Sequence, residues 1–462
     1  MKKYGAIILA VLILAIFIFL PSPLGLSKAG KNTIGLAVFF LILLIKQPVP
    51  LPVICLLLVA LMPLVGAVST LSEALEGYKS TVLYFTIASF CLSTAFISVP
   101  LSNRILKMIL KTFAKSTNKL IFGMMICAAL VSSVVSNIPT TAVFIALGTG
   151  ILATIKNEEK KKSIGRALMI SVVLASMIGG MMTPAGSSLN MLGIGLLQKS
   201  TGITITFIQW MMVGIPVVLV MIPLAWLLIV RIYKPAELSG DEMTDCINAV
   251  EKPGRMESNE LFFLILFTST VVLWILSSWV AVLDVNIIAI ISACICFFPG
   301  LRILSEKSFE SMAHWDIFFV QGAAISLGLA MIGTGVDKWF IQFAFSSLDP
   351  LPLYILVALC ALFVFFMLLL IPVAPAMISF FSAGFIALAD AQGVSPVVTI
   401  LVLTMCTANC YLLPLDSVPL LGLNTGYFSI PDIAKTSVFL QLSAVCLLGL
   451  WLPNICRWLS II

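Results

Sequence analysis

The sequence predicts an all-α polytopic membrane protein, and its composition and the length of its apolar runs both support that fold class. Of the 462 residues, 61% are hydrophobic and only 10% are charged, and the mean hydropathy is +1.17. A water-soluble chain of this length exposes far more polar surface. Many runs approach the roughly 20 apolar residues that cross a bilayer, so we expect about eleven transmembrane helices. Short alternating strands, the pattern of a membrane β-barrel, are not seen.

The N-terminal quarter begins with Lys2 and Lys3, which precede a long apolar stretch without a small-residue cleavage site. We therefore expect a retained first helix with a cytoplasmic N-terminus. Predicted spans lie near 4–20, 32–46, 49–66 and 81–99. The stretch 101–119 then has basic residues at spacings of three and four and no acidic residue. That pattern predicts an amphipathic helix on the cytoplasmic surface.

The rest of the chain repeats a similar layout on either side of a polar linker at 234–258. Before the linker, a polar-interrupted segment at 120–155 is followed by apolar segments at 165–182, 186–198 and 208–232. After it, an interrupted stretch at 372–390 lies among apolar segments at 260–280, 284–299, 315–335, 350–371, 394–415 and 436–455. Internal repeats of this kind are typical of transporters.

Two pairs of motifs support the repeat. "SNIPTTAVF" (136–144) aligns with "PVAPAMISF" (372–380), which places Pro139 opposite Pro375. "MTPAGSSLNML" (182–192) aligns with "LLPLDSVPLLG" (412–422), which places Pro184 opposite Pro414. We therefore expect an inverted repeat with two re-entrant helical hairpins, one in each half.

The first of these motifs has hydrogen-bonding side chains inside an apolar segment, and we interpret Pro139 as opening the backbone there. Irregular backbone at membrane depth is tolerated where it lines a cavity or is buried in protein. Helix N-termini attract anions, whereas free carbonyls and hydroxyl oxygens suit a monovalent cation. The alternative is that the hydroxyls bond back to their own helix and that the prolines are ordinary kinks. The polar residues concerned are Ser136, Asn137, Thr140 and Thr141, and in the second motif Thr183, Ser187, Ser188 and Asn190.

Asp416 is the most unusual single residue, because it lies inside the apolar stretch "LLPLDSVPLL". A carboxylate there costs several kcal/mol unless it is paired, coordinated or protonated, so it is a candidate coupling residue. A position near the membrane interface is the alternative. No nucleophile–base pair or phosphate-binding loop stands out, and the eleven cysteines lack metal-ligand spacing. We therefore expect neither an enzyme nor a cofactor other than a coupling ion.

These motifs resemble those of the divalent-anion:sodium symporter family of dicarboxylate and sulfate carriers, within the ion transporter superfamily. The resemblance rests on "SNIPTTAVF", "GGMMTPAGSSLNML", "HWDIFFVQGAAISLGLAMIGTGVDKWF" and "ANCYLLPLDSVPLLGLNTGYFSIPDIAK", together with the early stretch "LMPLVGAVSTLSEALEGYKSTVLYF". It implies a homodimer in the plasma membrane, in which a transport domain moves against a fixed scaffold as an elevator.

Carried over by residue, the resemblance implies a Na⁺ site formed by Ser132, Ser136, Asn137 and Gly186. Candidate substrate-binding residues are Asn137, Thr140, Thr141, Ser187, Asn190 and Ser417. The chain also departs from the family pattern. Ile138 replaces the threonine of the first Ser-Asn-Thr signature, the second signature is replaced at 372–374, and Asp416 occupies the place of a small residue.

The resemblance divides the chain into five parts. They are N-terminal scaffold helices with the amphipathic helix (1–119), a first transport region with hairpin 1 (120–233), the linker (234–258), second-repeat helices (259–371), and hairpin 2 with the C-terminal helices (372–462).

We expect cotransport of a small divalent anion, such as succinate, malate or sulfate, with Na⁺ or with H⁺ through Asp416. An arsenite or oxyanion exporter and a transport-dead sensor or assembly subunit are the alternatives. The net charge of +6 is assigned to loops facing anionic lipid and not to nucleic-acid binding.

Overall fold

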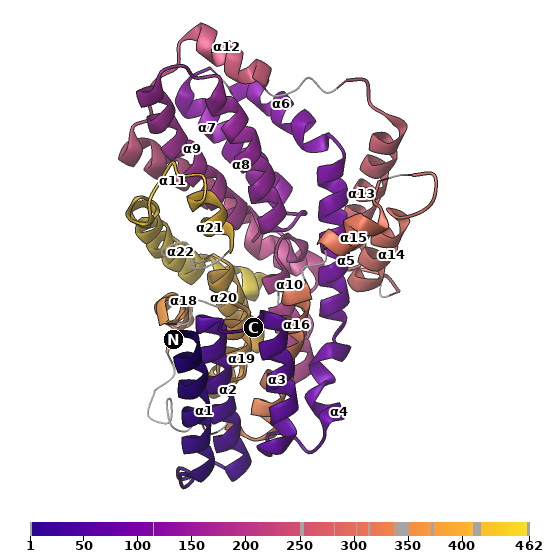
Figure 1. The fold of residues 1–462 in the computed structure, drawn as a ribbon, viewed down its shortest axis with the longest axis vertical. Coiled ribbons are helices and arrows are strands. Elements are labelled where there is room, and N and C mark those ends of the chain that lie inside the picture. The colour runs from indigo at the N-terminus through magenta and orange to yellow at the C-terminus, as the bar shows by residue number, and fades with distance from the viewer. Residues whose placement is uncertain are drawn as a thin grey trace.

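The computed structural model is helical throughout the residues it describes, which are 2–113, 115–249, 254–280, 282–301, 303–312, 315–336, 339, 351–370, 374–409 and 417–459. Within those ranges every regular element is a helix (Figure 1). The predicted all-α class is confirmed.

The first half contains eleven α-helices and two short 3₁₀ helices, η1 and η2. Their bounds are α1 Lys2–Phe19, α2 Lys28–Lys46, α3 Leu51–Leu64, α4 Leu71–Ala74, η1 Glu76–Lys79, α5 Thr81–Ser98, α6 Leu101–Phe113, α7 Thr117–Ser132, α8 Asn137–Ala153, α9 Glu158–Gly179, η2 Pro184–Gly186, α10 Ser188–Thr201 and α11 Phe207–Tyr233.

The second half starts with a helix inside the predicted linker. The described elements are α12 Gly240–Ala249, α13 Ser258–Leu276, α14 Val285–Ile295, α15 Glu306–Met312, α16 Trp315–Gly333, α18 Leu353–Leu370, α19 Ala374–Ala391, α20 Pro396–Ala408, α21 Ser417–Leu423 and α22 Ile430–Trp458.

Eight helices in the described part of the chain are long and apolar enough to cross a membrane, namely α2, α5, α9, α11, α13, α16, α19 and α22. Shorter apolar helices, such as α3 and α8, accompany them. The segment predicted as a span at 284–299 forms only the 11-residue α14. Eleven residues reach about 16 Å, which is too short to cross hydrocarbon alone. The apolar sequence continues past the helix, but its backbone does not stay helical.

The first hairpin consists of α7 and α8, which are joined by residues 133–136 and both pack on α9. Pro139 does not open this backbone, so that interpretation was wrong. It is the third residue of α8, where the first turn of a helix has no intrahelical N–H bond to lose. Pro375 is the second described residue of α19, and residues 371–373 before this helix lie outside the described part of the chain. Pro139 therefore begins a helix, and in the first half the break precedes the proline.

The repeat is visible in the packing. The α7–α8 pair packs on α9, and α18 and α19 pack on α20. The short helix α10 packs against α19 and α20, whereas α21 packs against α8 and α9. Each short helix that follows a break therefore contacts the hairpin of the other half, in the centre and upper part of Figure 1. Two related halves that pack against each other in inverted orientation produce such reciprocal contacts.

The predicted amphipathic helix at 101–119 is shorter than expected, because α6 ends at Phe113 and α7 begins at Thr117 with Ser116 as its cap. Arg104 of α6 forms a two-point ion pair with the buried Glu260 in the first turn of α13, with Nη2 2.8 Å from Oε2. This pair fixes the connecting helix to the second half.

The polar linker at 234–258 is attached to the first half of the chain by a hydrogen bond and an ion pair. Glu237 Oε2 accepts the backbone N–H of Thr117 at 3.1 Å, and Glu242 of α12 pairs with Lys160 at 3.0 Å. These contacts attach the linker to the starts of α7 and α9.

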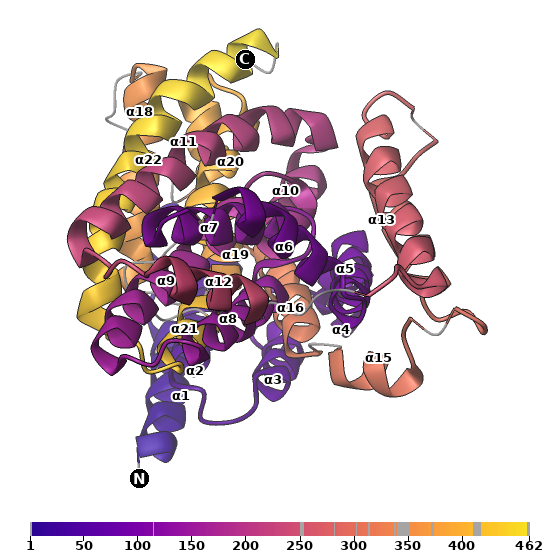
Figure 2. The same cartoon turned by 90° about the horizontal axis from the view of Figure 1, so that it is seen from above.

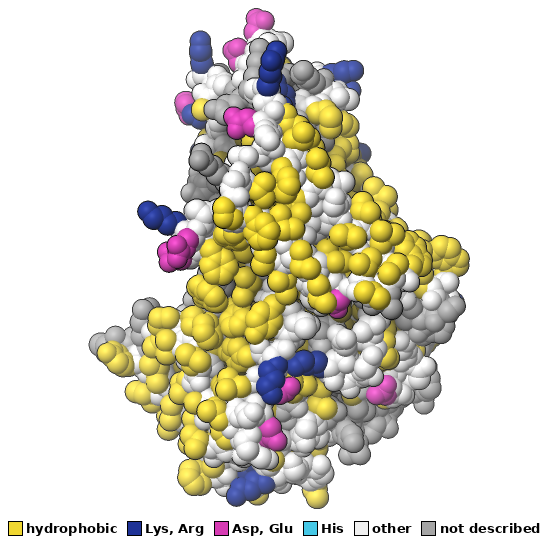
Figure 3. Space-filling model, turned by 90° about the vertical axis from the view of Figure 1, so that its right-hand side faces the viewer, with side chains coloured by type: hydrophobic (Ala, Val, Ile, Leu, Met, Phe, Trp, Pro, Cys, Tyr) yellow, Lys and Arg dark blue, Asp and Glu magenta, His cyan; other side chains and the backbone are white. Residues whose placement is uncertain are grey.

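The outer surface fits a lipid environment. Seen from above, α13 and α15 lie to one side of the main bundle, next to α5 (Figure 2). On the face shown in Figure 3, apolar side chains cover most of the middle, and charged side chains lie at the top, at one edge and in the lower part. Large exposed apolar residues of α13 and α14 include Ile265, Ile287 and Ile291. Together with the spans, this surface establishes a multi-pass membrane protein.

Candidate functional site: a junction of four helix ends

Four helix ends meet around the first hairpin. Asn137, the first residue of α8, contacts Ser132 at the end of α7, Ser176 near the end of α9, and Gly186 just before α10. The end of α7 therefore brings the Ser132 hydroxyl and the end of α9 brings the Ser176 carbonyl to the place where α8 and α10 begin. The C-terminal ends favour a cation and the N-terminal ends an anion. The junction has both chemistries within a few ångströms.

The Asn137 amide lies at the centre of the junction and is 8% exposed. One of its terminal atoms is 2.8 Å from Ser132 Oγ, 2.9 Å from Gly186 O and 3.2 Å from Ser176 O. With nitrogen at that place, the two N–H groups of the amide are shared among the three oxygens. With Oδ1 at that place, the amide oxygen accepts a hydrogen bond from Ser132 Oγ. Four oxygens then lie close together, and the Ser132 hydroxyl supplies the one proton between them. Such a group suits a hard cation.

Two glycines make room for this arrangement. A Cβ on Gly180 would lie 2.0 Å from the Asn137 amide, and a Cβ on Gly186 would lie 2.6 Å from Gly180 O. No side chain fits at either distance. The glycines therefore let the loop backbone approach the amide closely enough to offer its carbonyl.

The loop 180–187 is held by its neighbours. Asn190 Nδ2 donates to Gly180 O at 2.9 Å and to Thr183 O at 3.0 Å. The Thr183 hydroxyl donates to Ser133 O, and Trp210 Nε1 donates to Met181 O at 2.9 Å. The irregular backbone is therefore satisfied and fixed, as buried backbone must be.

The other predicted residues of the first half surround the junction. Thr140 donates its hydroxyl to Val135 O and Thr141 to Asn137 O, both at 2.8 Å. In this structure both hydroxyl protons bond to backbone, and contact with a substrate stays a prediction. Ser187 caps α10 by accepting the Leu189 N–H at 3.3 Å. Ser136 precedes α8, is 7% exposed, and makes no capping bond with its side chain.

The corresponding half of the site is only partly described. Asp416 and the replaced signature at 372–373 lie outside the described residues, and Ser417 is described only by its backbone, as the first residue of α21. The roles assigned to Asp416 and Ser417 therefore remain predictions.

Sequence reasoning missed two members of the junction, Ser176 and Gly180. The carbonyl of Ser176 accepts the Ser132 hydroxyl at 2.6 Å, and Gly180 lies against Asn137. The available signal was the Gly-Gly pair in "SMIGGMMTP", which marks a close approach near a helix end. The partner of that approach is on another helix, so its identity required the structure.

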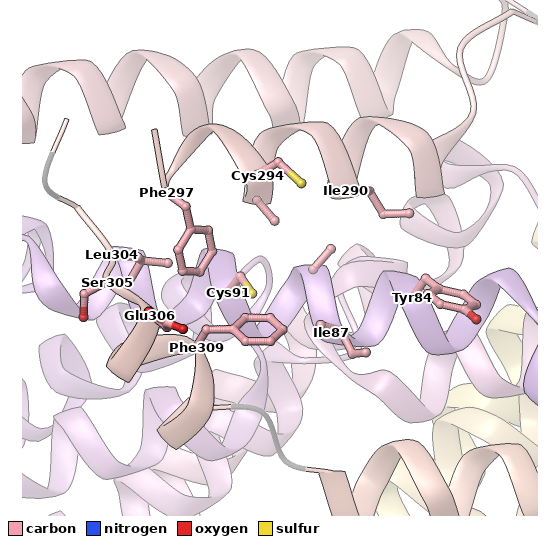
Figure 4. Close-up of a pocket in the computed structure, with 12 residues that line it drawn as sticks. Tyr84, Ile87, Cys91, Ile290, Cys294, Phe297, Leu304, Ser305, Glu306 and Phe309 are labelled. Carbon is pink, nitrogen blue, oxygen red and sulfur yellow. The ribbon is translucent and has the colours of Figure 1, made fainter. Parts of the chain in front are cut away.

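A cavity of about 550 Å³ lies away from the junction, between α5, α14 and α15 (Figure 4). Its walls are mostly apolar, including Ile87, Ile290, Phe297 and Phe309. An anion has almost no hydrogen-bond donors there, so this cavity is not an anion site. A smaller cavity of about 210 Å³ touches Pro184 and Met191, beside the first break.

Comparison with known proteins supplies the family. The family described as the sodium:sulfate symporter transmembrane region matches residues 1–461. The sodium-dependent dicarboxylate transporter SdcS of Staphylococcus saprophyticus is 25% identical over 96% of this chain and 89% of that protein. A membrane protein of Cupriavidus necator is 25% identical over 72% and 68% of the two chains. The SdcS of Staphylococcus aureus is 23% identical, and the match spans 65% of its length.

Solved structures agree on the fold. MtrF of Neisseria gonorrhoeae superposes with a TM-score of 0.61 at 12% identity, covering 97% of this chain and 94% of that one. YdaH of Alcanivorax borkumensis gives 0.59 at 15% identity, covering 98% and 96%. The family match over almost the whole chain, the helical membrane fold and the junction of helix ends lead to one conclusion. The chain is a membrane carrier that belongs to the sodium:sulfate symporter transmembrane family.

Proposed function

We propose that the chain is a secondary transporter that moves a small divalent anion across the plasma membrane together with Na⁺. Succinate and malate represent the favoured class, the C4 dicarboxylates, and sulfate is the inorganic alternative. The observation that carries the proposal is the group of three oxygens within 3.2 Å of the Asn137 amide, at a junction of helix ends. The names of the family and of the SdcS relatives support it.

The Asn137 amide provides a mechanism for coupling. Without Na⁺, its nitrogen faces Ser132 Oγ, Ser176 O and Gly186 O and takes the place of the cation. Na⁺ replaces those three hydrogen bonds, and the amide turns its oxygen toward the ion. The nitrogen is then free to donate to the anion. Cation binding thereby prepares the anion site, and by linkage the anion strengthens cation binding equally.

The charges around the junction explain why a cation is needed. The segments 132–137 and 176–190 contain no Arg or Lys. A divalent anion there is balanced only by helix N-termini and by bound cations. Neutralising it before it crosses the hydrocarbon avoids most of the cost of moving a bare charge.

The elevator motion and the homodimer belong to the same proposal. The exchanged packing of α10 and α21 builds one compact unit from both hairpins, which is the unit that would move. Asp416 is proposed as a second coupling position, where a proton replaces the cation of the missing second signature.

A thermal-stability panel tests the proposal. The purified protein is heated with succinate, malate, 2-oxoglutarate, citrate or sulfate, each in Na⁺ and in choline buffer. A true ligand at 100 times its Kd raises the free energy of unfolding by about 2.7 kcal/mol. We expect one anion class to stabilise the protein in Na⁺ only, and Asn137→Ala to abolish the shift.

Asn454→Ala is the matched control, since this asparagine on α22 is exposed and bonds Leu450 O and Tyr354. Equal stabilisation in choline would reject Na⁺ coupling. The absence of any anion-dependent shift would reject the transport function.

A further inference from the structure

Ser176 has an unusual hydroxyl. It is completely buried on α9, and its Oγ has no hydrogen-bond partner. A helical serine normally donates to a carbonyl three or four residues back, as Ser171 of the same helix does to Leu168 O at 2.7 Å. A buried polar atom without a partner destabilises the protein and calls for an explanation, such as a missing ion.

The direction of Ser176 is fixed by its neighbours on α9. A Cβ at Gly179 would lie 2.4 Å from Ala129 Cα of α7, and a Cβ at Gly180 would lie 2.0 Å from the Asn137 amide of α8. Residues three and four apart share one face of a helix. Ser176 therefore faces the seam between α7 and α8, on the side of the oxygens around Asn137.

A second unpaired oxygen lies at the same break. Asn190 is fully buried, and its Oδ1 has no partner. Its orientation is set, because Nδ2 bonds both Gly180 O and Thr183 O. The loop 180–187 thus has an unsatisfied acceptor on its α10 side and an unsatisfied hydroxyl on its α9 side. Two unpaired oxygens around one irregular loop point to a cation and not to a single packing defect.

We propose that Ser176 Oγ is an additional ligand of the coupling cation, on the face of the site opposite the Ser-Asn signature. The inference rests on the proposed function, because it assumes that Na⁺ binds at the junction. Ser132, Asn137 and Gly186 supply ligands from the hairpin and the loop, and Ser176 supplies one from α9. The ion would then bridge α7, α8 and α9, so that its binding closes the hairpin onto the helix behind it.

The test compares Ser176→Ala with Ser171→Ala in the full-length protein. Melting temperature is titrated against NaCl, with choline chloride holding the ionic strength constant. Ser176→Ala removes an unpaired hydroxyl, so we expect an ion-free melting temperature equal to or above that of the wild type. We expect its Na⁺ midpoint to rise about tenfold, the effect of losing one ligand. Ser171→Ala removes a paired hydroxyl and should lower the ion-free melting temperature without moving the midpoint.

Ser176→Cys is the second variant, because it keeps the volume but replaces the hard oxygen by a soft sulfur. It should weaken Na⁺ binding as Ser176→Ala does. A wild type that responds to Na⁺ while both Ser176 variants keep the same midpoint overturns this inference alone. A wild type without any Na⁺ response overturns the proposed function, and the role of Ser176 falls with it.

Discussion

The described helices of the two hairpins pack in corresponding ways, with α7 and α8 on α9 and with α18 and α19 on α20, but their opening residues differ. The first has Asn137 and Pro139 in the opening turn of α8, and the second has Ala374 and Pro375 in the opening turn of α19. Each is followed by a hydroxyl that bonds back along its helix, Thr141 to Asn137 O and Ser379 to Pro375 O. The first hairpin faces oxygens, whereas the second begins with apolar residues. In the sequence, the two hairpins therefore differ in the chemistry of the residues at the start of α8 and α19.

This comparison predicts that loss of the polar amide at the tip of the first hairpin is far more harmful than loss of a polar side chain on α19 of the second. Asn137→Ala removes the amide that contacts three oxygens, and we expect Na⁺-dependent uptake to fall at least about a hundredfold, which corresponds to about 2.7 kcal/mol. Ser379→Ala removes a back-bonded hydroxyl of α19 and should leave uptake within about twofold. Uptake of radiolabelled substrate into proteoliposomes measures both. Equal losses would refute the asymmetry.

Gly180→Ala sharpens the same point without removing any polar group. Its new Cβ would lie 2.0 Å from the Asn137 amide, so either the loop or the amide must move. Overpacking of this kind costs about 1–3 kcal/mol, and we expect a roughly tenfold or larger rise in the Na⁺ midpoint. Gly150→Ala on α8 is the control, because its Cβ meets nothing within 4 Å. A normal Na⁺ midpoint in Gly180→Ala would mean that the amide does not bind the ion.

Asp416→Asn tests the second-half motif at 412–422 directly. If a proton on Asp416 replaces the missing cation, uptake by the wild type should depend on pH, and the variant should lose that dependence with a several-fold change in rate. Initial uptake rates between pH 5.5 and 8.5, at saturating Na⁺, measure this. A wild type that is insensitive to pH would remove Asp416 from the coupling scheme.

The smallest effect is expected far from both hairpins. The backbone N–H of Ser239, the Lys160 ammonium and the Ser239 hydroxyl lower the pKa of Glu242 on α12 below its ordinary 4.5. A lowered acid pKa stabilises the fold above pH 4.5 and loses that contribution as the pH falls through the lowered value. Hydrogen exchange should therefore show α12 loosening in acid. In Glu242→Gln, the α12 amides should already exchange faster than in the wild type at neutral pH, and their exchange protection should change little further in acid.

Much of the fold followed from the sequence, because composition and apolar run length decide the helical membrane class. Helix ends were harder to predict. Pro139 looks like a breaker in sequence but starts a helix, since proline is compatible with both places. The apolar run at 284–299 contains a helix of only 11 residues, because hydrophobicity does not show where a helix stops.

The candidate site was likewise predicted from the sequence only in part. The family resemblance pointed to Ser132, Ser136, Asn137 and Gly186. The structure brings Ser132, Asn137 and Gly186 together, and the role of Ser136 stays a prediction. Ser176 has no motif of its own. Its role depends on α9 packing against α7, through contacts between segments 44 residues apart. Such a contact is tertiary, and no local pattern specifies it.

Uptake driven by a Na⁺ gradient tests the central claim most directly. Proteoliposomes containing the wild type are given radiolabelled succinate, or the anion chosen by the stability panel, with an inward Na⁺ gradient or with choline. The account predicts that the wild type accumulates substrate with Na⁺ only and that Asn137→Ala loses this accumulation. In Gly180→Ala, the Na⁺ concentration that gives half-maximal uptake should be higher than in the wild type. Accumulation that is equal in choline, or unaffected by Asn137→Ala, would contradict it.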